Sequence, residues 1–333
     1  DALSPPILLS MLLRVSLLAS VLLLTACGGA TVASGPPAVG RTFATAEEAP
    51  AFDGTAFQGA RLYDLRAGVW LDEDALFAAL AEPPLVFFGE QHETAPVQEL
   101  ELWMLERLFQ RHGDVSLAME HFQRDEQAVI DRYLAGEIDT ATFERTAQVW
   151  PRYARYWKPL VERVKAEGRP LFGLNVPSEV LEGVYASYPK RPLDAFNGLG
   201  TRYDAQLPPR PLAPWDDTFQ RYFFTGFDPA AHGSRMGMSA EEARQYFTDL
   251  AHIRDEAMGY WTAQALAAVG GRIFVVAGDW HVRTGLATPM RAVRYAGGGI
   301  AYKLVTTIPE GELESLKAGY EGQAVADYVI TYR

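Results

Sequence analysis

The sequence predicts an α/β protein with a mixed, largely parallel central sheet, flanked by helices and carrying a smaller helical and irregular insert. Two short apolar runs, at 84–88 and 273–277, lead into Gly-x-x-His. Runs of β-branched and aromatic residues bounded by Pro or Gly are typical of strands covered on both faces. A helical segment separates the first run from another apolar run at 115–119, and this order predicts a parallel pair joined by a crossover.

The composition is that of a folded globular protein. The chain has 333 residues, of which 48% are hydrophobic and 22% are charged, enough for one large domain or for one domain with an insert. The formal net charge of −12 provides no basic surface for a polyanion. We therefore expect no nucleic acid among the partners.

Residues 1–27 have the pattern of a signal peptide with a lipobox. The segment 15–24 is almost wholly apolar, follows Arg14 and leads into Leu-Thr-Ala-Cys27, but it is too short to cross a bilayer. It resembles a bacterial lipobox, which implies cleavage before Cys27 and lipidation of that residue. A buried N-terminal helix with an incidental cysteine is the alternative. Cys27 is the only cysteine, so no disulfide can form within the chain.

The segment after Cys27 has the composition of a flexible linker between the lipid anchor and the folded domain. Residues 28–50 are rich in Gly, Ala, Pro and Ser and indicate a flexible tether. The fold is expected to begin near Phe52, which gives a domain over 51–333. Because Gly28 rather than an aspartate follows Cys27, we expect a lipid-anchored protein of the cell envelope, held at the outer membrane and facing the periplasm.

Local signals predict the elements of the first half of the domain. The segment 72–80 has a helical pattern, and a second helix runs from the cap Thr94 to about Gln110, with a proline in its first turn. Residues 124–157 are again helical in pattern. The segment 170–174 is a third strand.

The second half begins with an irregular segment. Residues 188–237 contain many Pro, Gly and aromatic residues without a clear period, which indicates an irregular insert. Ser239–Glu242 is a capping-box pattern that opens a helix to about Val269. Later strands are predicted at 300–306 and 328–332.

Polar residues follow three of the predicted strands. They are Glu90, His92, Glu120, Asp279 and His281. Because open α/β sheets bind ligands outside the carboxyl ends of their strands, these side chains converge if the strands are neighbours. Two imidazoles with one or two carboxylates suit zinc, manganese or iron. The same residues could act without a metal, with a histidine as general base. A purely structural role at helix caps and loops is the third alternative.

A second candidate region interleaves aromatic residues with cations. It contains Arg152, Tyr153, Arg155 and Tyr156. Such a segment suits a flat anionic ligand such as haem, because rings stack on it, guanidinium groups bind its carboxylates and a tyrosinate can bind ferric iron. Residues 221–224 repeat the pattern more weakly. The alternative is that these aromatic residues only pack in the core, with arginine stems over them.

Six short blocks occur in order between Leu85 and Met290. They are Phe88-Gly89-Glu90-Gln91-His92, Ala118-Met119-Glu120, Tyr133-Leu134-Ala135-Gly136-Glu137, Gly173-Leu174-Asn175-Val176-Pro177, Arg254-Asp255-Glu256-Ala257-Met258 and Ala277-Gly278-Asp279-Trp280-His281-Val282-Arg283. Together they resemble the signature of ChaN-type haem-binding lipoproteins. This family belongs to the Tiki superfamily, which also holds metalloproteases and erythromycin esterases.

The resemblance implies a lipid-anchored haem-binding protein that serves haem and iron acquisition at the cell envelope. It implies haem as cofactor and, as partners, an outer-membrane haem receptor and a second copy of the chain, with haem between the two protomers. A tyrosine on the iron and a histidine near the propionates are implied as well. From this and from the composition of 150–158 we expect haem contacts from His92, His281, Tyr153, Tyr156, Arg152, Arg155 and Arg283.

The hydrolases of the superfamily imply an alternative function. Their active site uses a Glu and a His of the first motif, an acid after the next strand and a late His, and the matching residues are Glu90, His92, Glu120 and His281. The alternative is a metal-dependent hydrolase of peptides or esters, in which these four residues bind a divalent metal or act in catalysis. The chain departs from the family at His121, where an apolar residue is expected, and in the insert at 188–237.

Overall fold

The computed structural model describes residues 40–224 and 228–333. The predicted signal peptide, its lipobox with Cys27 and residues 28–39 of the predicted tether lie outside the described residues. Within the described ranges, no helix combines the length and the apolar character that a membrane span requires.

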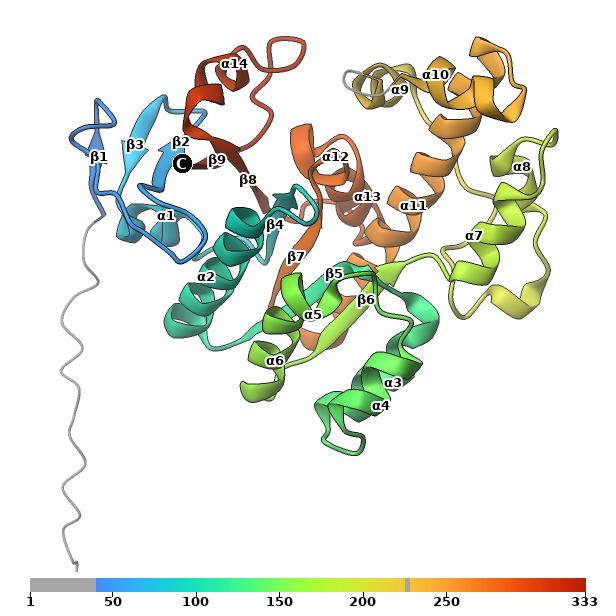
Figure 1. The fold of residues 1–333 in the computed structure, drawn as a ribbon, viewed down its shortest axis with the longest axis horizontal. Helices are drawn as coiled ribbons and strands as arrows, with labels where there is room; N and C mark the ends of the chain where they lie inside the picture. The colour runs from blue at the N-terminus through green and yellow to red at the C-terminus, as the bar shows by residue number, and fades with distance from the viewer. Residues whose placement is uncertain (1–39, 225–227) are drawn as a thin grey trace, which may run out of the picture. The chain divides into compact units, whose positions relative to one another are not determined.

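One mixed sheet of nine strands organises the domain (Figure 1). Its strands, in spatial order, are β1 (Thr42–Phe43), β3 (Val69–Leu71), β2 (Arg61–Asp64), β9 (Tyr328–Tyr332), β8 (Tyr302–Pro309), β4 (Leu85–Glu90), β7 (Arg272–Gly278), β5 (Val115–Gln123) and β6 (Leu171–Asn175). The strands from β9 to β6 are parallel to their neighbours, whereas β1, β3 and β2 form an antiparallel edge that joins β9. The predicted α/β class with a largely parallel sheet is confirmed.

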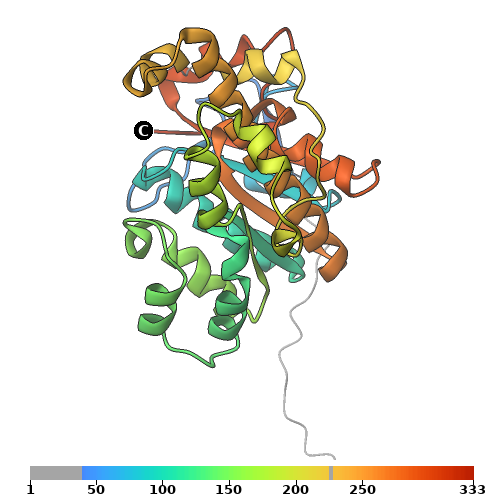
Figure 2. The ribbon, with the colours of Figure 1, turned by 90° about the vertical axis from the view of Figure 1, so that its right-hand side faces the viewer.

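Helices cover both faces of this sheet. They are α1 (Glu73–Ala79), α2 (Ala95–His112), α3 (Gln127–Leu134), α4 (Thr140–Thr146), α5 (Tyr153–Tyr156), α6 (Lys158–Ala166), α7 (Ser178–Tyr185), α8 (Pro192–Asn197), α9 (Asp217–Phe223), α10 (Pro229–Gly233), α11 (Ala240–Val269), α12 (Asp279–Val282), α13 (Thr288–Tyr295) and α14 (Leu313–Lys317). In both views α3 and α4, in green, lie away from α9 and α10, in yellow to gold (Figures 1 and 2).

Alternate strand residues divide the core into two layers. Phe88 of β4 belongs to the core layer that contains Leu100 of α2, whereas Phe87 belongs to the layer that contains Met258 of α11. This follows from the period of two in a strand, where successive side chains point to opposite faces. Both faces are buried, which explains why the predicted strands are continuous apolar runs.

The crossover that leaves β4 and the crossover that leaves β7 run in opposite directions along the sheet. From β4 the chain passes through α2 to β5, beyond β7, and from β7 it passes through α13 to β8, beyond β4. The helices of the two crossovers pack on opposite faces. A crevice forms outside the carboxyl ends of two strands that diverge in this way, and this is the usual ligand position in open α/β sheets.

Most predicted elements coincide with observed ones. The helix at 72–80, the helix from Thr94, the strands at 85–88, 170–174, 273–277 and 328–332, and the long helix after Ser239 are all present. Ser239 forms the predicted capping box with Glu242. The strand predicted at 115–119 continues to Gln123, and the strand predicted at 300–306 runs over Tyr302–Pro309.

Three segments differ in detail from expectation. The sheet begins at Thr42, before Phe52, because residues 42–43 pair with β3. The helical segment 124–157 consists of α3, α4 and α5 joined by turns. The irregular insert at 188–237 contains the short helices α8, α9 and α10, whose lengths of five to seven residues are too small for a visible helical period.

Candidate functional site

The carboxyl ends of β4, β7 and β5 bring the polar residues of both Gly-x-x-His motifs together. Because β7 lies between β4 and β5, Glu90, Gly278 and Glu120 are carried by adjacent strands. A Cβ atom added to Gly278 would lie 3.0 Å from Nε2 of His92 and 3.4 Å from Oε2 of Glu120. His92 and Glu120 thus both reach into the space that a side chain at position 278 would occupy.

Glu90 is the centre of a buried cluster on the α2 face of the sheet, which we call the Glu90 group: Glu90, His92 and His121. Its Oε1 atom contacts Nδ1 of His92 and lies 2.7 Å from Nε2 of His121. The Oε2 atom accepts hydrogen bonds from Nε2 of Gln98 at 3.1 Å and from the indole N–H of Trp157 at 3.0 Å. Burial alone would raise the pKa of Glu90, but the His121 imidazole and the hydrogen bonds lower this pKa well below its ordinary value.

His92 is the member of the Glu90 group that reaches solvent. Its side chain is 39% exposed, whereas those of Glu90 and His121 are buried. Partial burial opposes a charge on the ring, but the hydrogen bond to Glu90 and the nearby carboxylates of Glu120 and Glu93 outweigh it and raise the pKa of His92 to about 9.

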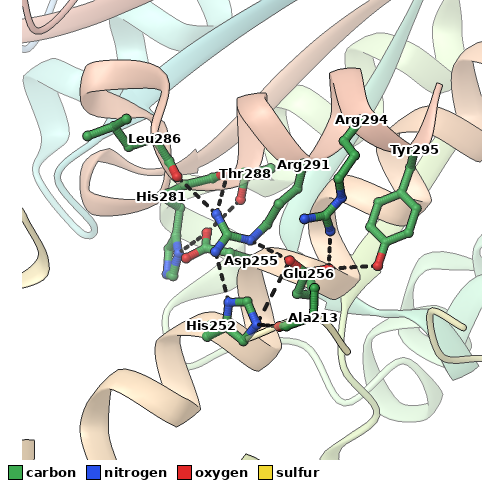
Figure 3. A network of polar contacts seen from close by, with 11 residues as sticks. Ala213, His252, Asp255, Glu256, His281, Leu286, Thr288, Arg291, Arg294 and Tyr295 are labelled. Carbon is green, nitrogen blue, oxygen red and sulfur yellow. Dashed lines mark hydrogen bonds and ion pairs between the residues drawn. The ribbon is translucent and has the colours of Figure 1, made fainter. Parts of the chain in front are cut away.

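A second cluster lies on the α11 face, and we call it the Glu120 group: Glu120, Asp255 and His281. Nδ1 of His281 lies 2.8 Å from Oδ1 of Asp255, which also accepts a hydrogen bond from the Thr288 hydroxyl at 2.8 Å (Figure 3). Nε2 of His281 lies 3.6 Å from Oε1 of Glu120. The backbone N–H of Gly278 donates to Oε2 of Glu120 at 2.8 Å. The Glu120 group is thus an imidazole oriented by one carboxylate and facing another.

The charges of the Glu120 group support one another. Burial opposes the ionised form of Glu120, but His281, His92, His121 and the Gly278 N–H outweigh burial and lower the pKa of this carboxyl to about 2. Burial likewise opposes the charge on His281, whose pKa is nevertheless raised by Asp255 and Glu120. A histidine held between two carboxylates is equipped to exchange a proton with a bound molecule.

A cleft of about 560 Å³ opens beside the Glu90 group. Its aromatic and charged wall is formed by His92, Tyr222, Asp279, Trp280, Arg283 and Tyr332. Trp280 is 41% exposed, and its ring centroid lies 5.7 Å from that of Tyr222. Arg283 forms an ion pair with Asp279. The volume is within the range of small-molecule sites.

The structure does not bring the residues of the 150–158 segment to this cleft. Tyr153 is buried in the core, against Phe122 and Phe143. Tyr156 and Arg155 line a separate, smaller cavity of about 210 Å³. Arg152 is exposed and forms an ion pair with Glu93. The physical reason is that the short helix α5 lies on α2 and α6, so its tyrosines complete the core rather than the site.

Sequence reasoning did not assign roles to three residues of the site. His121 follows Glu120 on β5 and therefore faces the opposite side of the sheet, toward Glu90. Asp255 lies on α11, and its only signal is its place in the block 254–258. Tyr222 belongs to the 221–224 segment, whose aromatic and cationic pattern was the signal, and reaches the cleft on α9 of the insert.

Comparisons with known proteins agree with this architecture. A family model described as haem-binding uptake, Tiki superfamily, ChaN matches residues 76–292. The structure of ChaN of Campylobacter jejuni, which shows cofacial heme binding, is similar to this chain with a TM-score of 0.58 at 13% identity, over 85% of this chain and 100% of that one.

More distant similarity extends to other proteins. An erythromycin esterase, EreC, in its open conformation has a TM-score of 0.44 at 11% identity, over 78% of this chain and 94% of that one. A succinoglycan biosynthesis protein has a TM-score of 0.43 at 14% identity, over 71% of this chain and 69% of that one. No curated protein matches the sequence.

Proposed function

The chain belongs to the family of haem-binding uptake proteins that includes ChaN, within the Tiki superfamily, and from this premise we propose that it binds haem in the cleft at the carboxyl ends of β4 and β7. The observation that carries the proposal is the composition of the cleft wall. An exposed tryptophan, two tyrosines, a half-exposed imidazole and an arginine surround a space of about 560 Å³. A flat, largely apolar macrocycle with two carboxylates fits such a wall.

Each part of the wall has a role in this proposal. Trp280 offers a ring face for stacking on the porphyrin, and the buried Tyr222 supports that ring, with the two centroids 5.7 Å apart. Arg283 offers a guanidinium for a propionate, in exchange for its ion pair with Asp279. His92 presents a half-exposed imidazole to the same space, where it can donate a hydrogen bond to a propionate. Haem is the cargo in this proposal, so its binding has to be reversible.

A hemin titration tests the proposal. The purified protein is expected to give a saturable Soret band with hemin, and Trp280→Ala and His92→Ala are expected to weaken binding at least tenfold, because each removes a wall of the cleft. His232→Ala is a matched control, since His232 is exposed on α10, outside the residues that line the cleft. A titration without saturation, or equal losses in all three variants, would contradict the proposal.

The biological setting completes the proposed function. We propose that lipid at Cys27 anchors the protein to the outer membrane, facing the periplasm, where it would receive haem delivered by an outer-membrane haem receptor and serve iron uptake. The lipobox supports the anchor. ChaN of Campylobacter jejuni binds heme cofacially, and this likeness supports a homodimer here. Analytical ultracentrifugation with and without hemin tests the dimer.

A hydrolase is a second candidate, favoured by the Glu120 group. An imidazole oriented by Asp255 at 2.8 Å and 3.6 Å from a second carboxylate has the arrangement of a general base with its orienting partner. This candidate predicts peptidase or esterase activity that His281→Ala abolishes while leaving hemin binding intact. If the unaltered protein and His281→Ala were equally inactive in peptidase and esterase screens, the hydrolase candidate would be ruled out.

A further inference from the structure

The Glu90 group contains three metal-ligand atoms in one place. One nitrogen each from His92 and His121 and one oxygen of Glu90 all lie within 4.8 Å of one another. In the part of the chain that the structure describes, this is the set of three such residues that comes together. It differs from the set expected from the sequence, since His121 joins it, whereas His281 is engaged by Asp255 in the Glu120 group.

The chemistry of these donors points to a particular class of ion. Two imidazoles and one carboxylate form a three-ligand set that binds zinc and similar ions, with a further position left for water or another molecule. We propose that Glu90, His92 and His121 bind one divalent transition-metal ion such as Zn²⁺, at a site that is distinct from haem coordination and does not require haem.

The distances are compatible with an ion after a small adjustment. In a tetrahedral zinc site with bonds of about 2.0–2.2 Å, neighbouring ligand atoms lie about 3.3 Å apart. Oε1 of Glu90 and Nε2 of His121 lie 2.7 Å apart. A rotation that moves these two atoms about 0.6 Å further apart therefore gives them the separation of two zinc ligands.

The surroundings hold two of the ligands in place. The second oxygen of Glu90 is fixed by Gln98 and by the indole of Trp157, so the carboxylate keeps its direction when the first oxygen binds the ion. The ring of His121 lies against two indoles, with centroids 4.3 Å from Trp157 and 4.7 Å from Trp150. Partners that orient the ligands in this way are a general property of metal sites.

A histidine at position 121 has a free-energy cost for the folded protein. Its side chain is 1% exposed, and its Nδ1 atom has no hydrogen-bond partner among the described residues. Leaving a buried polar atom unpaired costs about 1–3 kcal/mol, which an apolar side chain of the same size would avoid. A ligand role for Nε2 gives a reason for an imidazole here.

The third ligand connects the ion to the cleft. His92 contributes Nδ1 to the group, while its exposed ring lines the cleft. Its Nε2 atom lies on the side of Gly278 and Glu120. When Nδ1 binds an ion, the ring proton is carried by Nε2, beside the Glu120 carboxylate.

Isothermal titration of the chelator-treated protein with ZnCl₂ tests the site, and Co²⁺ absorption provides a second readout of the ligand geometry. One Zn²⁺ per chain is expected. His121→Gln is expected to weaken Zn²⁺ binding at least tenfold, because glutamine keeps a donor for Glu90 but lacks an imidazole. His232→Ala is the control and should bind Zn²⁺ as the unaltered protein does. Thermal unfolding of each variant checks that it is folded.

The same proteins titrated with hemin separate this inference from the proposed function. His121 does not line the cleft, so His121→Gln should retain hemin binding while it loses Zn²⁺. Absence of Zn²⁺ binding, or Zn²⁺ binding unchanged in folded His121→Gln, would overturn the metal site and leave the haem proposal standing. If the unaltered protein bound Zn²⁺ but not hemin, the haem proposal would be overturned and the metal site would stand.

Discussion

At the residue scale, the site depends on one backbone position without a side chain. Gly278 leaves the space into which His92 and Glu120 both reach. Gly278→Ala is expected to push both side chains by a few tenths of an ångström and to lower the free energy of unfolding by about 1 kcal/mol, the low end of the cost of overpacking. Weaker hemin binding should accompany this loss. Urea unfolding and a hemin titration measure the two effects.

Gly183→Ala is the matched control for this substitution. Gly183 lies in α7 with no atom within 4 Å of an added Cβ. Alanine there should be neutral or stabilise the helix by about 0.5–1 kcal/mol. If the two alanine variants behaved alike, close packing at Gly278 could not be the reason for the glycine.

Glu126 provides a test of pH dependence away from the site. Burial raises the pKa of this carboxyl to about 8, although its hydrogen bond from the Gln123 N–H opposes the shift. Between its ordinary pKa of 4.5 and about 8, the folded chain holds a proton that the unfolded chain releases. Ionisation of Glu126 therefore favours the unfolded chain, and the free energy of unfolding falls as the pH rises through that window.

Glu126→Gln should remove that part of the pH dependence. Urea unfolding of both proteins at pH 5 and pH 8 is the measurement, and the unaltered protein is expected to lose more stability between the two values than the variant. Parallel profiles would show that Glu126 is ionised in the folded protein at both pH values.

The residues of the site were predictable to different degrees. Glu90, His92, Glu120 and His281 could be predicted because they end or follow strands that are evident from apolar runs. Tyr153 was expected near haem and lies in the core, since composition does not reveal which way a four-residue helix turns its side chains. Asp255 escaped assignment because it reaches His281 from a helix distant in sequence.

At the element scale, a buried network joins α11 to α13 (Figure 3). Glu256 of α11 accepts hydrogen bonds from Nε of Arg291 at 2.9 Å and from the Tyr295 hydroxyl at 2.6 Å, and it pairs with Arg294. Arg291 also donates to Nδ1 of His252 at 2.8 Å. Burial and Arg291 lower the pKa of His252, which is therefore neutral near pH 7.

Substitutions at Glu256 and at Arg294 are expected to lower the free energy of unfolding by different amounts. Glu256→Gln leaves the buried guanidinium of Arg291 without its counter-charge and should lower the free energy of unfolding by about 3–5 kcal/mol. Arg294→Ala removes a side chain that is 45% exposed, and the loss should stay below about 1 kcal/mol. Denaturant unfolding of the two variants measures the difference. Similar losses would contradict the assignment of Arg291 as the principal partner.

Elements were predictable where a local pattern is long enough. The helix of 30 residues after Ser239 has a capping box and a sustained pattern, and β4 and β7 are continuous apolar runs. The strands β2 and β3 have four and three residues, too few for a period. They are held by pairing, with each other and with β9 from the far end of the chain, and such pairing leaves no local signal.

At the scale of the whole molecule, the order of strands in the sheet creates the site. The two Gly-x-x-His motifs are separated by nearly 190 residues, and they meet because β4 and β7 are adjacent. The sequence predicts two similar strand ends, but not that β7 inserts between β4 and β5. That order depends on which long-range pairings bury the most surface, a comparison that no single segment reveals.

The membrane anchor is expected to be separable from haem binding. The lipobox predicts that lipid is attached at Cys27, whereas the cleft is built from residues between Glu90 and Tyr332. Cys27→Ala should therefore abolish incorporation of labelled palmitate in bacterial cells and move the protein from the membrane fraction to the soluble fraction. Hemin affinity of the purified variant should stay within about twofold of the unaltered protein, because no residue of the cleft is changed. Retention of the label in the variant would contradict Cys27 as the lipidation site, and loss of hemin binding would contradict the separation of anchor and cleft.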